Sequence, residues 1–183
     1  NDDYVDSIVA QMYRRLEALY EQQKDHLGSP YHGDGSTLST NYGLALDTPA
    51  TPDGRKDGET FADGTLSPVT GTDSAGPTAV LLSASKINPL DTFNHLLNQK
   101  FLPQFLEGSN KEKFISYLRS WLDLGIAHIQ FNVVDKATLL EAQKYPEKHP
   151  NLIVRVAGYS AYFNDLSRGM QDHIIARSEQ AFA

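Results

Sequence analysis

Ser74 is the first residue whose surroundings suggest chemistry, because it follows Asp73 within a short segment that has glycine at both ends, 71–76. A serine in such a setting can be the nucleophile of acyl transfer if a histidine base and a buried aspartate are available. Upstream of Ser74 the candidate bases are His26 and His32, and no series of alternating strands holds them. The segment is better explained as the start of a helix with a proline in its first turn.

Metal coordination has little support in the sequence. The histidines form no HExxH motif and no other pair of ligands on one helix face. The chain has no cysteine, which excludes disulfides, thiolate metal sites, iron–sulfur ligation and a thiol nucleophile within it. Motifs that cradle phosphate groups are also missing, so we expect no metal and no bound cofactor. The six histidines are His26, His32, His95, His128, His149 and His173.

The segment 128–134 alternates strictly between polar and apolar residues, which predicts a strand. His128, Gln130 and Asn132 then share one face of this strand. That face could line a polar cavity for a substrate. A hydrogen-bonded or solvated strand face explains the same pattern equally well, so both interpretations stay open.

A single glycine, Gly158, follows the buried strand predicted over 152–157. A lone glycine at such a point normally marks a positive φ angle or a close approach of another backbone. No Asn, Asp or Pro lies beside it before Asn164, which is unusual for a turn in solvent. We therefore expect a buried loop. Its apolar and aromatic neighbours are Val156, Ala157, Tyr159, Ala161, Tyr162 and Phe163.

Several helices and strands must position these residues. The apolar spacing predicts an amphipathic helix from Tyr4 to about Gln23, with Val5, Ile8, Val9, Met12, Leu16, Leu19 and Tyr20 as its buried stripe. Residues 28–77 are rich in glycine and proline and are expected to form turns, with a possible strand over Thr37–Leu46. Asp73 or Ser74 is expected to cap a helix that contains Pro77.

The rest of the chain reads as strand, helix, strand, loop and helix, the pattern of parallel α/β units. Asn110 is expected to cap a helix that ends at Gly125 and buries Phe114, Ile115, Leu118, Trp121 and Leu122. Further helices are expected from Asp135 to about Lys144 and from Asp165 to about Gln180.

Charge and hydropathy exclude two classes of partner. The chain of 183 residues carries a net charge of −7, and its basic residues are scattered, so nucleic acid is a poor candidate. No apolar run approaches the roughly 20 residues of a membrane-spanning helix. The acidic N-terminus is unlike a signal peptide, so we expect a soluble, intracellular protein. The absence of an initial Met suggests a fragment or a trimmed product.

The segment 155–161 closely resembles the signature of the glycyl radical enzymes, the family of pyruvate formate-lyase and its dehydratase, lyase, decarboxylase and succinate-synthase relatives. Arg155, Ala157, Gly158, Tyr159 and Ala161 fit that signature. The likeness continues upstream, to the branch that contains glycerol dehydratase and choline lyase. It covers 50–56, 61–64, 66–68, 76–80, 83–86, 97–100 and 128–134.

The resemblance implies an α/β fold, the C-terminal part of a ten-stranded α/β barrel with the glycyl-radical loop inside the barrel. Residues 1–27 would be a scaffold helix, and 28–77 would wrap the barrel and contribute one strand to it. Residues 78–183 would be the glycine radical domain, with the radical loop at 153–163. Asn41, Tyr42 and the face of His128, Gln130 and Asn132 would lie near a substrate cavity.

The resemblance also implies chemistry. Gly158 would carry a stable radical on its α-carbon, installed by a separate radical-SAM activating enzyme. Glycine suits this role because an α-carbon without a Cβ can flatten and share the unpaired electron with both flanking amides. The radical would take a hydrogen atom from a cysteine, and the thiyl radical would attack a small-molecule substrate. Oxygen would cut the chain at Gly158. The resemblance further implies a homodimer in the cytoplasm of an anaerobic prokaryote.

The missing cysteine leaves two interpretations. The chain is either the end of a much longer polypeptide, which we favour, or a separate radical-carrying subunit that docks into a cysteine-bearing partner. The family breaks or forms C–C, C–O, C–N and C–S bonds. The segment 94–108 resembles the fumarate-adding succinate synthases more than the diol dehydratases, lyases or decarboxylases.

Overall fold

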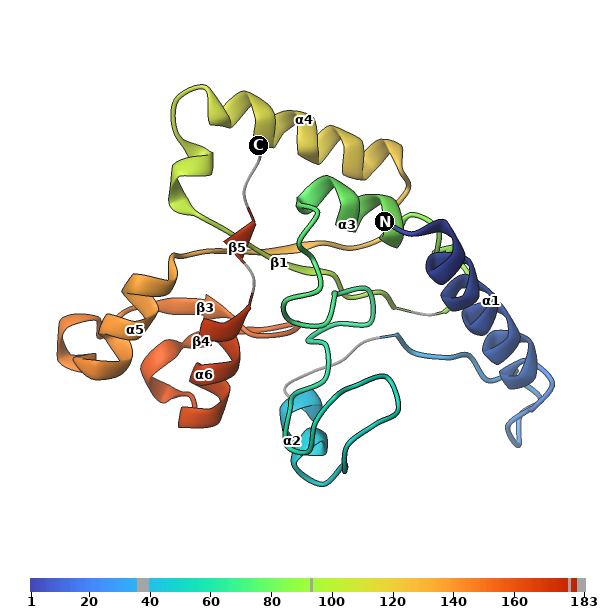
Figure 1. The fold of residues 1–183 in the computed structure, drawn as a ribbon. Helices are drawn as coiled ribbons and strands as arrows, with labels where there is room; N and C mark the ends of the chain where they lie inside the picture. Colours follow the sequence, from blue (N-terminus) through green and yellow to red (C-terminus); the bar gives the residue numbers. More distant parts are fainter. Residues whose placement is uncertain (36–39, 93, 178, 181–183) are drawn as a thin grey trace.

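The computed structural model describes residues 1–35, 40–92, 94–177 and 179–180 (Figure 1). Its helices are α1 (Asp3–Tyr20), α2 (Thr40–Leu46), α3 (Pro77–Ala84), α4 (Asn110–Asp123), α5 (Lys136–Lys144) and α6 (Arg168–Ala176). Its strands are β1 (Asn98–Phe101), β2 (Gln130–Val133), β3 (Ile153–Arg155), β4 (Ser160–Tyr162) and β5 (Glu179–Gln180). Short 3₁₀ turns lie at 103–106, 146–148 and 163–165.

A three-stranded parallel sheet in the order β2-β1-β5 lies in the middle of the molecule (Figure 1). The central strand, β1, was not predicted. Its first three residues, Asn98, Gln99 and Lys100, are polar yet buried, so they show neither the alternation nor the apolar run by which a strand is recognised. Asn98 lies opposite Gln130 of β2, and Lys100 lies opposite Glu179 of β5. The sheet thus joins three segments that are far apart in the sequence.

The second strand of the expected parallel unit, β3, does not join this sheet. It pairs antiparallel with β4, with Ile153 opposite Tyr162 and Arg155 opposite Ser160. The prediction of a parallel β2–α5–β3 unit is therefore wrong. The physical reason is the short connection after β3: a tight turn brings β4 back beside it, whereas a parallel neighbour requires a long crossover. The hairpin lies between α5 and α6 on one side of the molecule (Figure 1).

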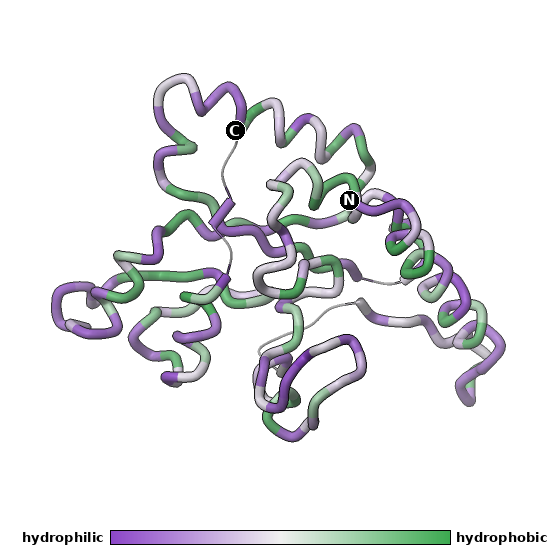
Figure 2. Tube along the Cα trace, viewed as in Figure 1, coloured by the Kyte–Doolittle hydropathy of each residue, from purple (hydrophilic) through white to green (hydrophobic). Residues whose placement is uncertain are grey.

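Helix α1 forms at the predicted position but presents the other face to the protein. Asp2 caps it, and its buried residues are Ala10 and Glu17. Polar and apolar residues alternate around it (Figure 2). The apolar stripe is exposed, since a helix buries an apolar face only against a partner, and the described residues supply none. The stripe consists of Val5, Ile8, Val9, Met12, Leu16, Leu19 and Tyr20, all 39–57% exposed.

The possible strand over Thr37–Leu46 is wrong where the structure describes it, because Thr40–Leu46 form helix α2. Asn41 and Ala45, four residues apart, are both buried, which is the spacing of one helix face. Residues 36–39 lie outside the described residues. A parallel bridge joins Gly35 to His95. The division into 1–27, 28–77 and 78–183 stays a prediction.

Helices α3, α4, α5 and α6 lie in regions predicted as helical, although two of the predicted caps and both ends of α6 differ. The N-cap of α3 is Gly76, not Asp73 or Ser74, and Pro77 is its first residue. Ser109, not Asn110, occupies the N-cap of α4. Asp135 caps α5 as predicted, accepting from Thr138 N at 2.6 Å. Helix α6 begins after Ser167, three residues into the region predicted as helical, because 163–165 form a 3₁₀ turn. The predicted end near Gln180 is also wrong, because α6 ends at Ala176 and Glu179–Gln180 form strand β5.

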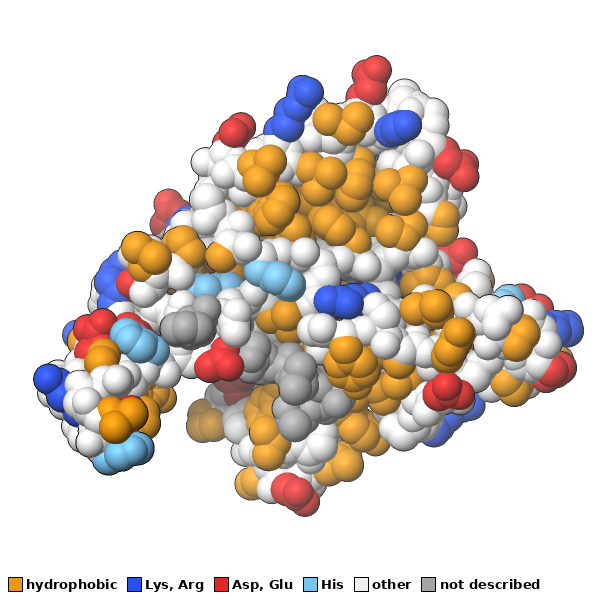
Figure 3. Space-filling view, turned by 180° about the vertical axis from the view of Figure 1, so that it is seen from behind, with side chains coloured by type: hydrophobic (Ala, Val, Ile, Leu, Met, Phe, Trp, Pro, Cys, Tyr) orange, Lys and Arg blue, Asp and Glu red, His pale blue; other side chains and the backbone are white. Residues whose placement is uncertain are grey.

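Two apolar clusters form the core. One joins α5, α6 and the hairpin, and the other joins α3 and α4 to the sheet. Of the stripe predicted for α4, Phe114 and Trp121 are half-buried, but Ile115 and Leu122 are 40% and 65% exposed. On the rear face, apolar side chains gather beneath α4 and remain in view (Figure 3). No helix in the described ranges combines the length and apolarity needed to cross a membrane.

Candidate active site

The tip of the β3–β4 hairpin carries Gly158. Val156 N donates to Tyr159 O at 2.9 Å, so Ala157 and Gly158 form the centre of a tight turn. Gly158 has a φ of 75°, and every residue with a positive φ in the described part of the chain is a glycine. A side chain at this φ would bring its Cβ too close to the backbone. The turn therefore favours glycine at 158, and the positive φ is one of the two features that a lone glycine predicted there.

The loop is buried on one side only. Val156 and Ala157 are 0% and 1% exposed, and Phe163 is fully buried below them. Gly158 is exposed, and Tyr159 and Tyr162 are 37% and 46% exposed. The prediction of a buried loop is thus wrong for its tip within this chain, because the described residues pack against the base of the hairpin and leave its outer side open.

Arg155, at the end of β3, is held by the polar face of β2. Asn132 Oδ1 accepts from Arg155 N at 2.6 Å, and Asn132 Nδ2 donates to Arg155 O at 2.6 Å. Arg155 Nε donates to Gln130 Oε1, and Nη1 donates to Ser160 Oγ at 3.2 Å. The structure therefore brings Gln130 and Asn132 together with Arg155. Their role toward a substrate stays a prediction.

Two functional candidates escaped the sequence analysis, Arg177 and Asp63. Arg177 Nη1 donates to Arg155 O at 2.9 Å and Nη2 donates to Val156 O at 2.7 Å. Arg177 Nε lies 2.6 Å from Asp63 Oδ2, and both side chains are less than 10% exposed. An isolated Asp and an isolated Arg have no local pattern.

Burial dominates the electrostatics around this ion pair. Burial lowers the pKa of Arg177, and the carboxylate of Asp63 opposes that effect. Burial and then the positive charge of Arg177 lower the pKa of His173 to about 4, with Asp63 again opposing. His128 is half-buried, and burial followed by the charge of Arg155 lowers its pKa. His128 and His173 are therefore neutral at pH 7.

Asn41 and Tyr42 lie on α2, which packs against α6. Asn41 Nδ2 donates to Phe61 O at 3.5 Å. Tyr42 packs so closely on Gly169 that a Cβ there would lie 1.7 Å from the Tyr42 hydroxyl. These contacts differ from those of Gln130 and Asn132. His128 precedes β2, so the prediction that it shares the strand face with Gln130 and Asn132 is wrong. A role in lining a substrate cavity stays a prediction for all five residues.

A small polar cleft adjoins the base of the hairpin, between the sheet and the segment that carries Asp63. Its lining includes two cations and two carboxylates in addition to side-chain amides. Lys100, in β1, is 1% exposed and lies 3.7 Å from Glu179, and burial lowers its pKa. The principal lining residues are Asp63, Asp73, Gln99, Lys100, Asn132 and Arg177.

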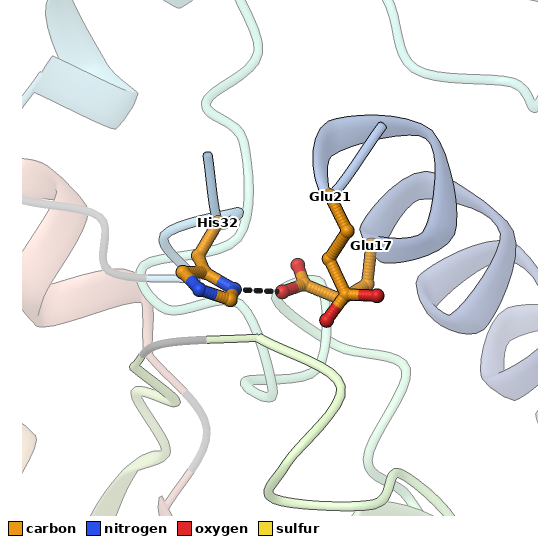
Figure 4. A group of neighbouring side chains, drawn as sticks. All are labelled: Glu17, Glu21 and His32. Atoms are coloured by element: carbon orange, nitrogen blue, oxygen red, sulfur yellow. Dashed lines mark hydrogen bonds and ion pairs between the residues drawn. The ribbon is translucent and has the colours of Figure 1, made fainter. Parts of the chain in front are cut away.

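One group of potential metal ligands occurs among the described residues, formed by Glu17, Glu21 and His32. The three side chains converge between the end of α1 and the segment that follows it (Figure 4). His32 Nδ1 lies 2.6 Å from Glu17 Oε1, and Gly33 N donates to Glu17 Oε2 at 2.9 Å. These hydrogen bonds link α1 to the segment that follows it, which gives the cluster a structural role.

Comparisons with known proteins agree with this geometry. The family model described as "Glycine radical" matches residues 62–164. The chain is 37% identical to the indoleacetate decarboxylase of Tractidigestivibacter scatoligenes, over 98% of this chain and 20% of that protein. It is 42% identical to the isethionate sulfite-lyase of Desulfovibrio desulfuricans, over 98% of this chain and 22% of that protein. The chain thus spans about a fifth of the length of the curated relatives that it matches.

Solved structures give the same result. The glycerol-bound, B12-independent glycerol dehydratase from Clostridium butyricum superposes with a TM-score of 0.92 at 41% identity, over 99% of this chain and 23% of the dehydratase. The expected fold, a mixed α/β part of the glycyl radical enzyme barrel, is confirmed. The preference for the succinate synthases finds no support, since the matches include a decarboxylase, a sulfite-lyase and a dehydratase. The chain belongs to the glycyl radical enzyme family and contains its glycine radical region.

Proposed function

We propose that Gly158 stores an unpaired electron on its α-carbon and that this radical starts catalysis. The observation that carries the proposal is the turn itself: a glycine with a φ of 75°, in the segment that fits the family signature. Without a Cβ the α-carbon can become planar, and both flanking amides can share the electron. The hydrogen bonds to residues 155 and 156 fix the base of the turn and leave Gly158 itself accessible.

The radical would act through a thiol that lies outside this chain. A hydrogen atom passes from the cysteine to the Gly158 α-carbon, so that an S–H bond breaks, a C–H bond forms and the unpaired electron moves to sulfur. This chain has no cysteine, so the thiol would come from outside it, either from the rest of a longer polypeptide or from a cysteine-bearing partner subunit. The exposed apolar stripe of α1 and the exposed tip of the hairpin are surfaces that such a part would cover.

The reaction we propose is bond cleavage in a small molecule, of the type carried out by a dehydratase, a lyase or a decarboxylase. The support is the range of activities among the relatives, which include a decarboxylase, a sulfite-lyase and a dehydratase. A separate radical-SAM enzyme would install the radical, and the complete protein would work as a homodimer in the cytoplasm of an anaerobic organism. Exclusion of water and oxygen would protect the radical.

The test is electron paramagnetic resonance of the full-length protein after anaerobic activation, for wild type, Gly158→Ala and Gly125→Ala. Gly125 is the matched control, since its φ is 67° and a Cβ there meets no atom within 4 Å. We expect a doublet from wild type and from Gly125→Ala, and none from Gly158→Ala. Air should cut the first two proteins at residue 158. A full doublet from Gly158→Ala would refute the proposal.

A further inference from the structure

We propose that Arg177 is the positioning residue of the radical-bearing turn and that Asp63 orients its guanidinium. This inference rests on the proposed function of Gly158. Arg177 touches neither Gly158 nor any reacting atom in the contacts described. It acts through the two carbonyl groups that immediately precede the turn, those of Arg155 and Val156.

The guanidinium contacts its partners through two hydrogen bonds and one ion pair. Its two terminal nitrogens donate to successive backbone carbonyls, at 2.9 and 2.7 Å, while Nε lies 2.6 Å from Asp63 Oδ2 without the geometry of a hydrogen bond. Successive carbonyls of an extended strand point in opposite directions. A donor that reaches both of them therefore fixes the point at which β3 ends and the turn begins. The planar guanidinium of arginine presents donors in a rigid fork, whereas the ammonium of lysine is a single point.

Asp63 is needed because the cation is buried. Arg177 is 9% exposed, and a buried charge is stable only when an opposite charge and hydrogen bonds compensate it. Asp63 is itself fixed from the sheet, since Asn98 Nδ2 donates to Asp63 O at 2.9 Å. The adjacent Gly64 lies against the backbone of Leu96. A continuous set of contacts thus runs from β1 through Asp63 and Arg177 to the base of the turn.

Asn132 and Arg177 have different roles at the base of the turn. Asn132 holds Arg155 from the side of β2, through both its N–H and its C=O. Val156 O has Arg177 as its only side-chain donor among the contacts described. Val156, which follows β3 and opens the turn, is thus the residue that depends on Arg177. Loss of the two hydrogen bonds from the guanidinium should make the turn more mobile, while β3 and β4 stay paired.

The experiment compares four full-length proteins: wild type, Arg177→Lys, Asp63→Asn and the control Arg168→Lys. Arg168 is an exposed arginine at the start of α6, the helix that Arg177 caps at its other end, and lies 3.5 Å from Asp172. Amide hydrogen exchange of residues 155–160 is measured before activation, so that this readout does not depend on a radical. The amount of radical per protomer is then measured by electron paramagnetic resonance after exhaustive anaerobic activation, and thermal unfolding reports the overall fold.

We expect Arg177→Lys to exchange about tenfold faster at residues 155–160, the effect of losing about one charge-assisted hydrogen bond, with α4 and α5 unchanged. Its radical content should fall several-fold although the cooperative unfolding transition persists. Asp63→Asn, which retains the arginine, should change the same residues in the same direction. Arg168→Lys should match wild type.

Wild-type exchange at residues 155–160 together with wild-type radical content in both variants would overturn the inference. Equal acceleration of exchange throughout the protein would also overturn it, because Arg177 would then be a general stabilising residue. Failure of the proposed function is recognised separately, by the absence of a doublet in wild type. The exchange comparison still decides the positioning role in that case.

Discussion

The side-chain amide of Asn132 pairs with both backbone groups of Arg155, as the backbone of a neighbouring strand would. The two hydrogen bonds are each 2.6 Å long and run in opposite directions. They connect β2, in the parallel sheet, to β3, in the hairpin, and these strands belong to separate sheets. A side chain thus replaces the missing backbone pairing between the sheet and the hairpin that carries Gly158.

Asn132→Leu should destabilise the protein by roughly 1–3 kcal/mol. Leucine has a similar size but leaves the backbone N–H of Arg155 without a partner. The backbone C=O of Arg155 still accepts the hydrogen bond from Arg177. Urea unfolding of wild type and variant measures the difference. Asn151→Leu is the control, because Asn151 is exposed. Equal stability of Asn132→Leu and wild type would mean that these bonds contribute nothing net.

Gly64→Ala should destabilise the protein by about 1–3 kcal/mol through overpacking. A Cβ at Gly64 would lie 2.3 Å from Leu96 O, and a backbone atom cannot rotate away as a side-chain end can. The melting temperature measures the effect. Gly43→Ala is the matched control: a Cβ there meets no atom within 4 Å, and alanine in a helix is favoured by about 0.5–1 kcal/mol. A melting temperature of Gly64→Ala at or above that of wild type would contradict this packing.

His173 should make the protein less stable as the pH falls. Its pKa is about 4 in the folded protein against 6.5 for the free side chain, mainly because of burial and then because of Arg177. Between these values the unfolded chain binds the proton and the folded one does not, so stability is full above pH 6.5 and declines toward pH 4. The loss is on the order of 3 kcal/mol.

Urea unfolding at a series of pH values tests this sign. His173→Gln should flatten the decline between pH 6.5 and 4, even if the variant is less stable throughout. Part of the decline should remain, because burial also lowers the pKa of His95 and of His128. His26→Gln, at an exposed position, is the control variant. An identical slope in His173→Gln and wild type would be inconsistent with a neutral, buried His173.

Gly158→Ala should cost about 1 kcal/mol of stability, because alanine disfavours a positive φ. Gly125→Ala should cost a similar amount, since Gly125 has a φ of 67°. Thermal unfolding of the two variants without activation isolates this backbone effect from any radical chemistry. If Gly158→Ala unfolded like wild type, the turn would not need glycine for its conformation.

The sequence by itself determined the elements whose signals are local. Helix α5 was predicted within a residue because Asp135 caps it and Pro146 follows it. The polar face of β2 followed from strict alternation, and Gly158 was identified from its own neighbours along the chain. Each of these depends on residues within one turn of helix or a few residues of strand, which is the range over which a single sequence carries a readable pattern.

The tertiary structure alone decided which elements meet. Nothing local marks β1 as a strand, because its buried polar residues find partners only after folding. The outward apolar stripe of α1 follows from which surfaces the chain provides. Asp63 and Arg177 are far apart in the sequence and become a pair only when β1, the hairpin and α6 pack together. Buried polar groups must be satisfied by whichever groups the fold brings within reach, and that is a property of the packed chain.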